Sequence, residues 1–260
     1  MILSNRLIPV LLLNGKGNSI IKTKKFKDDV YLGDCLNAVK IFNEKEVDEL
    51  VIIDVSCSKN NSKPKFNLIE SIASECFMPL AYGGGISNLE HAKKLFEIGV
   101  EKIIINSCSF NYDFIKELSN IYGAQSILVS IDYKSNFFGT KELYINSGKV
   151  KSNVKLDQHL KKLNEAGVGE IILHSISRDG MMNGYDIEMI KKVSSSIEQP
   201  LVALGGASEM NDFKDAIDSG ASAVAAGSFF VFFGKHKAVL ITYPKIEEIQ
   251  KFLNISYEMQ

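Results

Sequence analysis

The chain has 260 residues, of which 45% are hydrophobic and 23% charged, and its formal net charge is −1 at pH 7. This composition is that of a globular protein and lies far from the disordered regime. The near-zero net charge gives no reason to expect a nucleic acid or a membrane as partner. A chain of this length buries roughly three-quarters of its unfolded surface, so it needs no disulfide or structural metal. We expect neither a metal nor a cofactor.

The four cysteines, Cys35, Cys57, Cys76 and Cys108, form no CxxC pair and have no zinc-like spacing. We therefore expect them to be small buried side chains in a reducing compartment. The first residues do not resemble a secretory leader, and no run reaches the roughly 20 apolar residues that a membrane-spanning helix needs. The sequence predicts a cytoplasmic protein.

Short runs rich in β-branched residues recur along the chain, and most are apolar throughout, as in strands buried on both faces. They lie at 7–13, 50–55, 78–82, 102–106, 126–132, 169–175, 200–204 and 222–227. Amphipathic helical patterns lie between them, at 34–44, 68–75, 89–97, 112–122, 156–166, 187–196 and 210–219. Eight strands that alternate with helices predict an α/β fold, a (β/α)8 TIM barrel that spans 1–260 as a single domain.

The sequence also repeats itself at a fixed spacing. Gly84-Gly85 returns 121 residues later as Gly205-Gly206, and several polar residues match at the same offset. The repeat predicts two fused half-barrels, at about 1–121 and 122–260.

Each Gly-Gly pair is followed by a helix and then by a strand that ends in a serine, Ser107 in the first half and Ser228 in the second. Glycines at such a turn let backbone N–H groups approach a phosphate, and a helix N-terminus favours an anion. Barrels commonly bind phosphate at the loops after strands 7 and 8. The repeat therefore predicts a substrate with a phosphate at each end. The alternative is that the glycines only make tight turns.

The Asp179-Gly180 pair predicts a turn in the loop after the sixth strand. Because this loop lies at the same end of the barrel, the pair is expected beside the second phosphate pocket.

Two carboxylates end predicted strands, where the catalytic residues of barrels are found: Asp54 after the second strand and Asp132 after the fifth. Two such groups on opposite sides of a substrate form an acid/base pair. The repeat, however, places Leu12 at the position that matches Asp132, 120 residues earlier. Leucine exchanges no proton, so the one predicted catalytic carboxylate, Asp132, faces a leucine. The alternative for Asp132 is a structural ion pair.

The segment 14–22 is polar, glycine-rich and cationic. It has the character of a mobile lid that reaches a phosphorylated substrate through Lys22; an ordinary surface loop is the alternative.

Four charged residues, Arg6, Glu49, Lys102 and Glu170, lie at or just before the start of predicted strands. We expect them to meet at the N-terminal end of the barrel, where a stability network is the default interpretation.

Together these residues resemble the cyclase subunit of imidazole glycerol phosphate synthase, the HisF family, over essentially the whole chain. The matching stretches are 6–9, 48–50 with Asp54, 83–86, 102–107, 130–132 with Lys134, 177–180 with 184–186, and 205–207.

The resemblance implies a role for each of these groups. One substrate phosphate would be bound by Gly85, Asn106 and Ser107, and the other by Asp179, Gly180, Gly206, Gly227 and Ser228. Asp54 and His174 would contact the substrate, and Lys22 would be the lid lysine. The four charges at the N-terminal end would gate ammonia, which a glutaminase of the HisH type, docked on that face, would send up the barrel.

The sequence departs from the family pattern at three places. Leu12 replaces a catalytic aspartate, the first lid is two residues longer, and His174 stands where threonine is usual. Losing one acid/base group typically costs about 10²–10⁴-fold in rate. A subgroup of HisF-like proteins resembles this chain more closely in its first strand. These accompany a HisH-like glutaminase and an N-acetyl sugar amidotransferase in surface-polysaccharide or glycan pathways.

Three hypotheses follow. The first is an ammonia-relaying subunit of a glutamine-dependent complex that serves sugar amidation. The second is a cyclase, a lyase of histidine biosynthesis, which converts the phosphoribulosyl aminoimidazole carboxamide ribonucleotide and ammonia to imidazole glycerol phosphate and AICAR, with Asp54 or His174 in the role of the missing aspartate. The third is a sugar-phosphate isomerase of the sister barrel family, which would also need the first-strand aspartate that Leu12 replaces.

Overall fold

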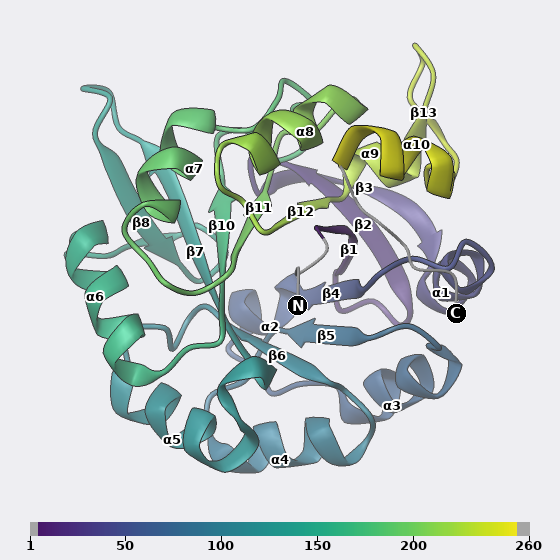
Figure 1. Ribbon diagram of the computed structural model, residues 1–260. Coiled ribbons are helices and arrows are strands. Elements are labelled where there is room, and N and C mark those ends of the chain that lie inside the picture. The colour runs from purple at the N-terminus through teal and green to yellow at the C-terminus, as the bar shows by residue number, and fades with distance from the viewer. Residues whose placement is uncertain (1–4, 254–260) are drawn as a thin grey trace.

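The computed structural model describes residues 5–253, and these form a closed barrel of eight parallel strands inside a ring of helices (Figure 1). The strands follow one another in chain order around the barrel, and the last pairs back onto the first. They are β1 (Arg6–Leu13), β4 (Leu50–Asp54), β5 (Leu80–Gly83), β6 (Lys102–Ile105), β7 (Ile127–Ser135), β10 (Glu170–Ser175), β11 (Leu201–Leu204) and β12 (Ala223–Ala226). The predicted (β/α)8 barrel is confirmed. The predicted span 1–260 extends beyond the described residues at both ends.

Seven helices alternate with these strands, and each overlaps a predicted amphipathic segment. They are α1 (Cys35–Glu44), α3 (Phe66–Glu75), α4 (Leu89–Glu97), α5 (Tyr112–Tyr122), α6 (Leu156–Ala166), α7 (Ile187–Ser194) and α8 (Met210–Asp218). Several begin at a residue whose side chain accepts a backbone N–H of the first turn, as Asp34 does for α1 and Asn88 for α4. Such caps fix where each helix leaves its loop.

Three further helices and one 3-10 turn have no counterpart in the predicted pattern. They are α2 (Val55–Asn60), α9 (Ser228–Val231), α10 (Ile246–Leu253) and the 3-10 turn Ala124–Ser126. The first two are short and directly follow barrel strands, so they lie at the carboxyl ends of the strands.

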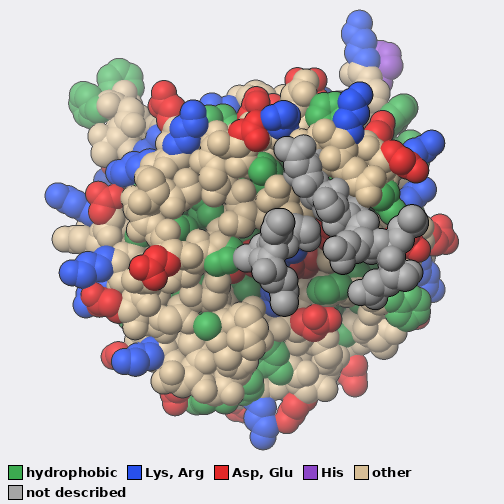
Figure 2. Space-filling model, in the orientation of Figure 1, with side chains coloured by type: hydrophobic (Ala, Val, Ile, Leu, Met, Phe, Trp, Pro, Cys, Tyr) green, Lys and Arg blue, Asp and Glu red, His purple; other side chains and the backbone are tan. Residues whose placement is uncertain are grey.

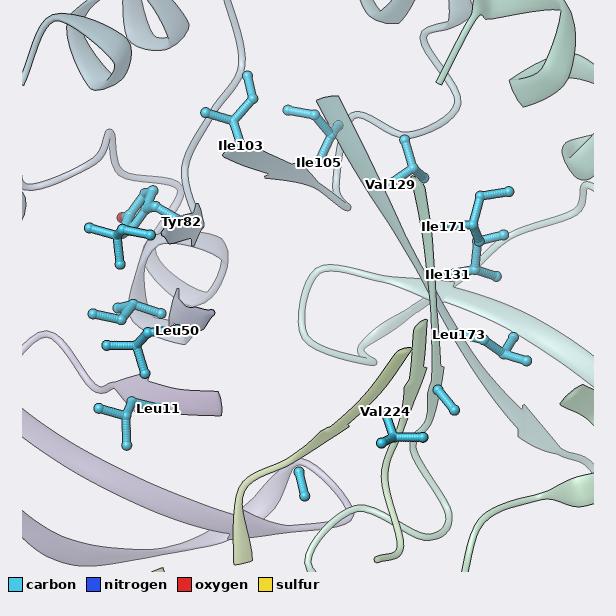
Figure 3. Packing of buried hydrophobic residues seen from close by; sticks show 14 of the residues in the cluster. Leu11, Leu50, Tyr82, Ile103, Ile105, Val129, Ile131, Ile171, Leu173 and Val224 are labelled. Atoms are coloured by element: carbon cyan, nitrogen blue, oxygen red, sulfur yellow. The ribbon is translucent and has the colours of Figure 1, made fainter. Parts of the chain in front are cut away.

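The strands are buried on both faces, as their apolar sequences predict. Side chains that point outward pack against the helices, and Figure 3 shows ten of them labelled, among them Leu11, Tyr82 and Ile171. Side chains of the opposite parity fill the barrel interior. This interior cluster is aliphatic and contains Ile8, Val10, Leu12, Val51, Ala81, Ile104, Leu128, Ile172, Val202, Leu204, Ala223 and Ala225, together with Ile21 from outside the barrel.

Within residues 5–253, further antiparallel strands are added to the barrel. The first hairpin is built from β2 (Ser19–Lys24) and β3 (Lys27–Asp34). β8 (Lys141–Ile145) pairs with the end of β7 and with β9 (Val150–Lys151), and β13 (Phe232–Phe233) pairs with β14 (Ala238–Val239). In Figure 1 the turn that joins β7 to β8 and the β13–β14 hairpin project from the molecule.

The first hairpin corrects the predicted loop at 14–22. The segment is irregular up to Ser19, where β2 begins. This strand pairs with both β1 and β3. Its β-branched residues, Ile20, Ile21 and Thr23, favour a strand, and Ile21 joins the apolar interior cluster. Lys22 consequently lies buried in a strand rather than on a free loop.

Cys35 and Cys57 are buried, as expected, whereas Cys76 and Cys108 are partly exposed; all four are free thiols. Within residues 5–253, no helix has the length and apolar character needed to cross a membrane. Figure 2 shows positive and negative side chains mixed over the face in view, in keeping with the small net charge.

Candidate active site

A cavity of about 730 Å³ opens at the carboxyl ends of the barrel strands. It is large enough for a phosphorylated small molecule. Several residues that the sequence singled out line it, among them Leu12, Asp54, Gly85, Asn106, Ser107, Asp132 and His174.

Asp132 on β7 is the carboxyl group best placed for acid/base chemistry. It is 7% exposed and accepts a hydrogen bond from Ser130 Oγ at 2.9 Å. Burial raises the pKa of Asp132 to about 6, although His174 and the Ser130 hydroxyl act in the opposite direction. A carboxyl group that titrates near neutral pH can both give and take a proton.

His174 on β10 lies between two aspartates. Its Nδ1 is 3.6 Å from Asp132 Oδ1, and its Nε2 is 3.8 Å from Asp179 Oδ1. The imidazole is buried, and the ring of Phe26 packs edge-on against it with 4.8 Å between the ring centroids. His174 is therefore fixed in orientation by its neighbours on both sides.

Asp179 anchors the β2–β3 hairpin. It accepts hydrogen bonds from Lys22 Nζ at 3.0 Å and from Thr23 Oγ1 at 2.7 Å, and its backbone oxygen accepts Lys25 N–H at 2.9 Å. Burial alone would raise the pKa of Asp179, but the Lys22 ammonium and His174 outweigh it and hold the pKa well below its usual range. Asp179 is thus an ionised carboxylate, in contrast to Asp132.

Leu12 forms part of an apolar wall of the same cavity. It is 6% exposed, and its neighbours in the wall include Ile53 and Ile104. Because these side chains have no donor, acceptor or proton to exchange, the chemistry of the cavity is confined to its polar side.

Asp54 on β4 has one oxygen in use and one without a partner. Its Oδ1 accepts the backbone N–H and the hydroxyl of Ser56, at 2.9 and 2.5 Å, and so caps helix α2. Its Oδ2 is buried and has no hydrogen-bond partner in the described part of the chain.

The first predicted phosphate pocket lies open in the cavity wall. Gly85 has φ +71°, and a Cβ there would lie 2.6 Å from the backbone oxygen of Ser62, so only glycine fits. Ser107 Oγ lies 3.4 Å from Ser58 Oγ, and Asn106 Nδ2 donates to the backbone oxygen of Ser130. The open pocket and its small polar residues suit an anion.

The structure does not bring the second predicted set into the wall of this cavity. A Cβ on Gly180 would lie 2.0 Å from Thr23 O, and one on Gly206 equally close to Gly184 O. These two glycines are thus required by close backbone packing.

Other members of this second set retain polar atoms of the kind that a phosphate needs. A Cβ on Gly227 would lie only 2.8 Å from Lys22 Nζ, which places the ammonium beside the start of helix α9. The Ser228 hydroxyl is buried and has no hydrogen-bond partner in residues 5–253. Lys22 therefore lies beside the end of β12.

The four charges at the N-terminal end of the barrel form one cluster. Arg6 forms ion pairs with both Glu49 and Glu170. Lys102 Nζ lies 2.7 Å from Glu49 and 3.7 Å from Glu170. Both glutamates are buried, and Glu49 Oε1 has no hydrogen-bond partner within the described chain. The cluster lies at the opposite end of the aliphatic interior from the cavity.

Sequence reasoning missed several residues of the cavity wall. His91 on α4 lies 3.0 Å from the backbone oxygen of Gly85 through Nδ1, and Lys59 and Lys63 follow β4. Asn146 and Ser147, in the turn between β8 and β9, reach the cavity from another part of the chain. Lys59 and Lys63 come soon after the end of a predicted strand, and this position could have marked them as cavity residues. Nothing in the sequence marks Asn146 and Ser147 in this way.

Comparisons with known proteins agree with this architecture. The family model described as "Histidine biosynthesis protein" matches residues 6–237. A Pseudomonas aeruginosa protein with the provisional name of imidazole glycerol phosphate synthase subunit hisF2 is 44% identical over 246 residues, which cover 94% of this chain and 97% of the relative. A Leptospira borgpetersenii protein provisionally named as imidazole glycerol phosphate synthase subunit HisF is 48% identical over 242 residues. These cover 92% of this chain and 94% of the relative.

More distant relatives extend the same relationship. The imidazole glycerol phosphate synthase subunit HisF of Dictyoglomus thermophilum is 32% identical over 231 residues, which cover 88% of this chain and 91% of that protein. Fold and site together define a (β/α)8 barrel with its polar cavity at the carboxyl ends of the strands. Within that class, the chain belongs to the HisF family of imidazole glycerol phosphate synthase cyclase subunits.

Proposed function

We propose that the chain is the ammonia-handling subunit of a glutamine-dependent amidotransferase complex. A glutaminase of the HisH type docks at the N-terminal face of the barrel, and ammonia passes along the barrel interior to the cavity. The acceptor is a sugar, which a separate N-acetyl sugar amidotransferase binds.

The observation that carries this proposal is the charge cluster beneath an aliphatic interior. Arg6 and Lys102 hold Glu49 and Glu170 at the N-terminal end of the barrel, and the apolar cluster above them is aliphatic. Such an interior penalises a charged ammonium ion strongly and an uncharged ammonia molecule far less. Because the interior is packed, passage requires small side-chain movements at each layer.

Leu12 distinguishes this role from cyclisation. A cyclase needs repeated proton transfers on a ribonucleotide, and the wall that Leu12 shares with Ile53 offers none. The same apolar wall suits a relay, because uncharged ammonia crosses it without protonation. Relatives named as imidazole glycerol phosphate synthase subunits support the glutaminase partner.

The second candidate is a cyclase of histidine biosynthesis. The observation that favours it is Asp132, whose pKa of about 6 suits a general acid/base in a cavity of substrate size. Lys22 beside Gly227 and the open pocket at Gly85 would then hold the two phosphates of the ribonucleotide. His174 or Asp54 would take the place of the missing aspartate.

One assay separates the two functions. The purified chain is mixed with the phosphoribulosyl aminoimidazole carboxamide ribonucleotide and an ammonium salt, and the formation of imidazole glycerol phosphate is followed. The relay proposal expects a negligible rate. Turnover close to that of a HisF with aspartate at the Leu12 position, measured side by side, would contradict it.

A second measurement tests the partner. Titration of a HisH-type glutaminase with the full chain should give a saturable complex and an increase in glutaminase activity. The absence of both would contradict the proposed assembly, whatever the cyclase assay shows.

A further inference from the structure

His174 in the cavity wall lies between two aspartates, Asp132 in the same wall and Asp179 outside it. Both of its nitrogens face a carboxyl oxygen, at 3.6 and 3.8 Å, and both gaps exceed a hydrogen-bond length. Its Nε2 is buried without a hydrogen-bond partner among residues 5–253. An imidazole held in this way, in the wall of a cavity, is placed to move a proton.

We propose that His174 is the proton-exchanging partner of Asp132 toward the nitrogen that enters the cavity. The backbone supports the pairing, because His174 lies directly opposite Asp132 where β10 and β7 pair. The partner thus comes from the neighbouring strand of the same half of the barrel, rather than from the far wall where Leu12 lies.

The groups that face the imidazole come from four elements. Asp132 lies on β7, Asp179 in the loop after β10, and Lys22 on β2 behind Asp179, while the Phe26 ring covers the imidazole from the hairpin tip. On the other side, Leu204 at the end of β11 lies directly opposite His174, and Gly205 follows it.

The two aspartates are suited to different tasks. Asp132 holds its proton up to about pH 6 because it is buried, whereas Asp179 is kept ionised by Lys22 and His174. Two carboxyl groups whose pKa values are shifted in opposite directions typically act as an acid and as a stabilising anion. Asp179 orients the imidazole and compensates its charge when it is protonated, and Asp132 exchanges the proton.

The proton step concerns the nitrogen that arrives in the cavity, and it therefore rests on the proposed ammonia relay. An ammonium ion formed at the solvent-facing mouth of the cavity gives one proton to the imidazole of His174. The N–H bond breaks, its electron pair stays on nitrogen as the lone pair of ammonia, and imidazolium forms beside Asp179. The imidazolium then passes the proton to the Asp132 carboxylate, which releases it to water. No electron is transferred, and the nitrogen is returned to its nucleophilic form.

The test is a histidine and aspartate side-chain NMR titration of the full chain. With only four histidines in the sequence, the missing signal in His174→Gln assigns His174. The matched control is His91→Gln, because His91 lines the same cavity but contacts neither aspartate in the geometry above.

The expected result is a coupled titration. In His174→Gln the midpoint of Asp132 rises by about one pH unit, because an opposite charge that lowers its pKa is lost. In His91→Gln the midpoint stays in place. In the wild type the His174 signal shows an inflection at the Asp132 midpoint, and Asp132→Asn abolishes it. Ammonium chloride shifts the His174 signal, whereas sodium chloride at equal ionic strength does not.

An Asp132 midpoint that is the same in His174→Gln and in the wild type would overturn the pairing. A His174 signal that responds equally to both salts would overturn its role toward ammonia. Because this test uses the chain alone, it is independent of the glutaminase titration, and the inference and the proposed function can fail separately.

Discussion

Leu12 on β1 and Asp132 on β7 occupy matching places in the two halves of the barrel. Leu12 lies opposite Ile53 on the next strand, β4, as Asp132 lies opposite His174 on its next strand, β10. Both side chains line the cavity. The strand register thus agrees with the 120-residue offset in the sequence, and one side of the cavity has a carboxyl group where the other has a leucine.

Restoring the carboxylate should restore part of the cyclase chemistry. We expect Leu12→Asp to raise ammonium-driven imidazole formation by about 10²-fold or more, because a second acid/base group is typically worth that factor. The substitution should lower the free energy of unfolding by about 1–3 kcal/mol, since Leu12 is buried among aliphatic side chains. The rate is followed at saturating ammonium. Leu12→Asn is the control, because it adds polarity without a titratable group; equal gains in both variants would show that proton exchange is not the missing element.

Lys102→Ala should separate the two sources of nitrogen. With the glutaminase present, glutamine-driven transfer should fall strongly, while ammonium-driven transfer stays unchanged, because added ammonium reaches the cavity without passing the charge cluster. Loss of Lys102 also removes one counter-ion of the buried Glu49, which should cost about 1–3 kcal/mol of stability. Lys214→Ala, in a surface pair with Asp218, is the control. Equal loss with both nitrogen sources would refute a gating role.

The predicted phosphate pocket at Gly85 and Ser107 can be tested with inorganic phosphate. Ser107→Ala should weaken phosphate binding by about two- to tenfold, the effect of one hydrogen bond. The affinity is measured by calorimetry. Ser74→Ala is the control, because Ser74 lies on α3 and donates to a backbone oxygen of its own helix. Unchanged binding in Ser107→Ala would leave Gly85 and its neighbours as turn residues only.

Much of this fold could be predicted from the sequence because barrel strands are buried on both faces. The apolar runs therefore mark the strands, and the 3.6-residue period marks the helices between them. The end of each strand then fixes which residues share the cavity, and Asp54, Asn106 and Asp132 are all found there. The charge cluster follows from the same logic at the opposite end.

What the sequence could not indicate were contacts made by chain that leaves the barrel. The β2–β3 hairpin turns on Lys25 and Phe26, both at positive φ, and neither residue type signals such a turn. For this reason the contact of Phe26 with His174, and the burial of Lys22, could not be foreseen. The close approach of Gly206 to Gly184 likewise depends on how two distant loops pack.

Asp132 should make the stability of the protein depend on pH in an unusual direction. Its pKa in the folded chain is raised from 3.8 to about 6, so between these values the folded chain holds a proton that the unfolded chain has released. This contribution to stability therefore decreases as the pH rises from about 4 to 6. Asp132→Asn removes the buried charge and should be more stable than the wild type at pH 7.5, by up to about 3 kcal/mol. At pH 4 the difference should vanish. Urea denaturation at the two pH values measures it, and a constant difference would contradict the raised pKa.

The contribution of Asp179 to stability should depend on pH in the opposite direction, and Asp179→Asn should detach the β2–β3 hairpin from the barrel. The pKa of Asp179 is held below its ordinary value, so its contribution is present at neutral pH and is lost as the pH falls through the acidic range. At pH 7 the substitution should cost about 2–4 kcal/mol, because Lys22 is left buried without its counter-ion. The exposed lysines at the hairpin tip, Lys24 and Lys25, provide a direct readout. Trypsin should cut there faster in Asp179→Asn than in the wild type, whereas cleavage at Lys235 in the β13–β14 hairpin should not change. If the hairpin stays as resistant as in the wild type, its attachment does not depend on the Asp179 side chain, and the backbone bond from Lys25 to Asp179 holds it instead.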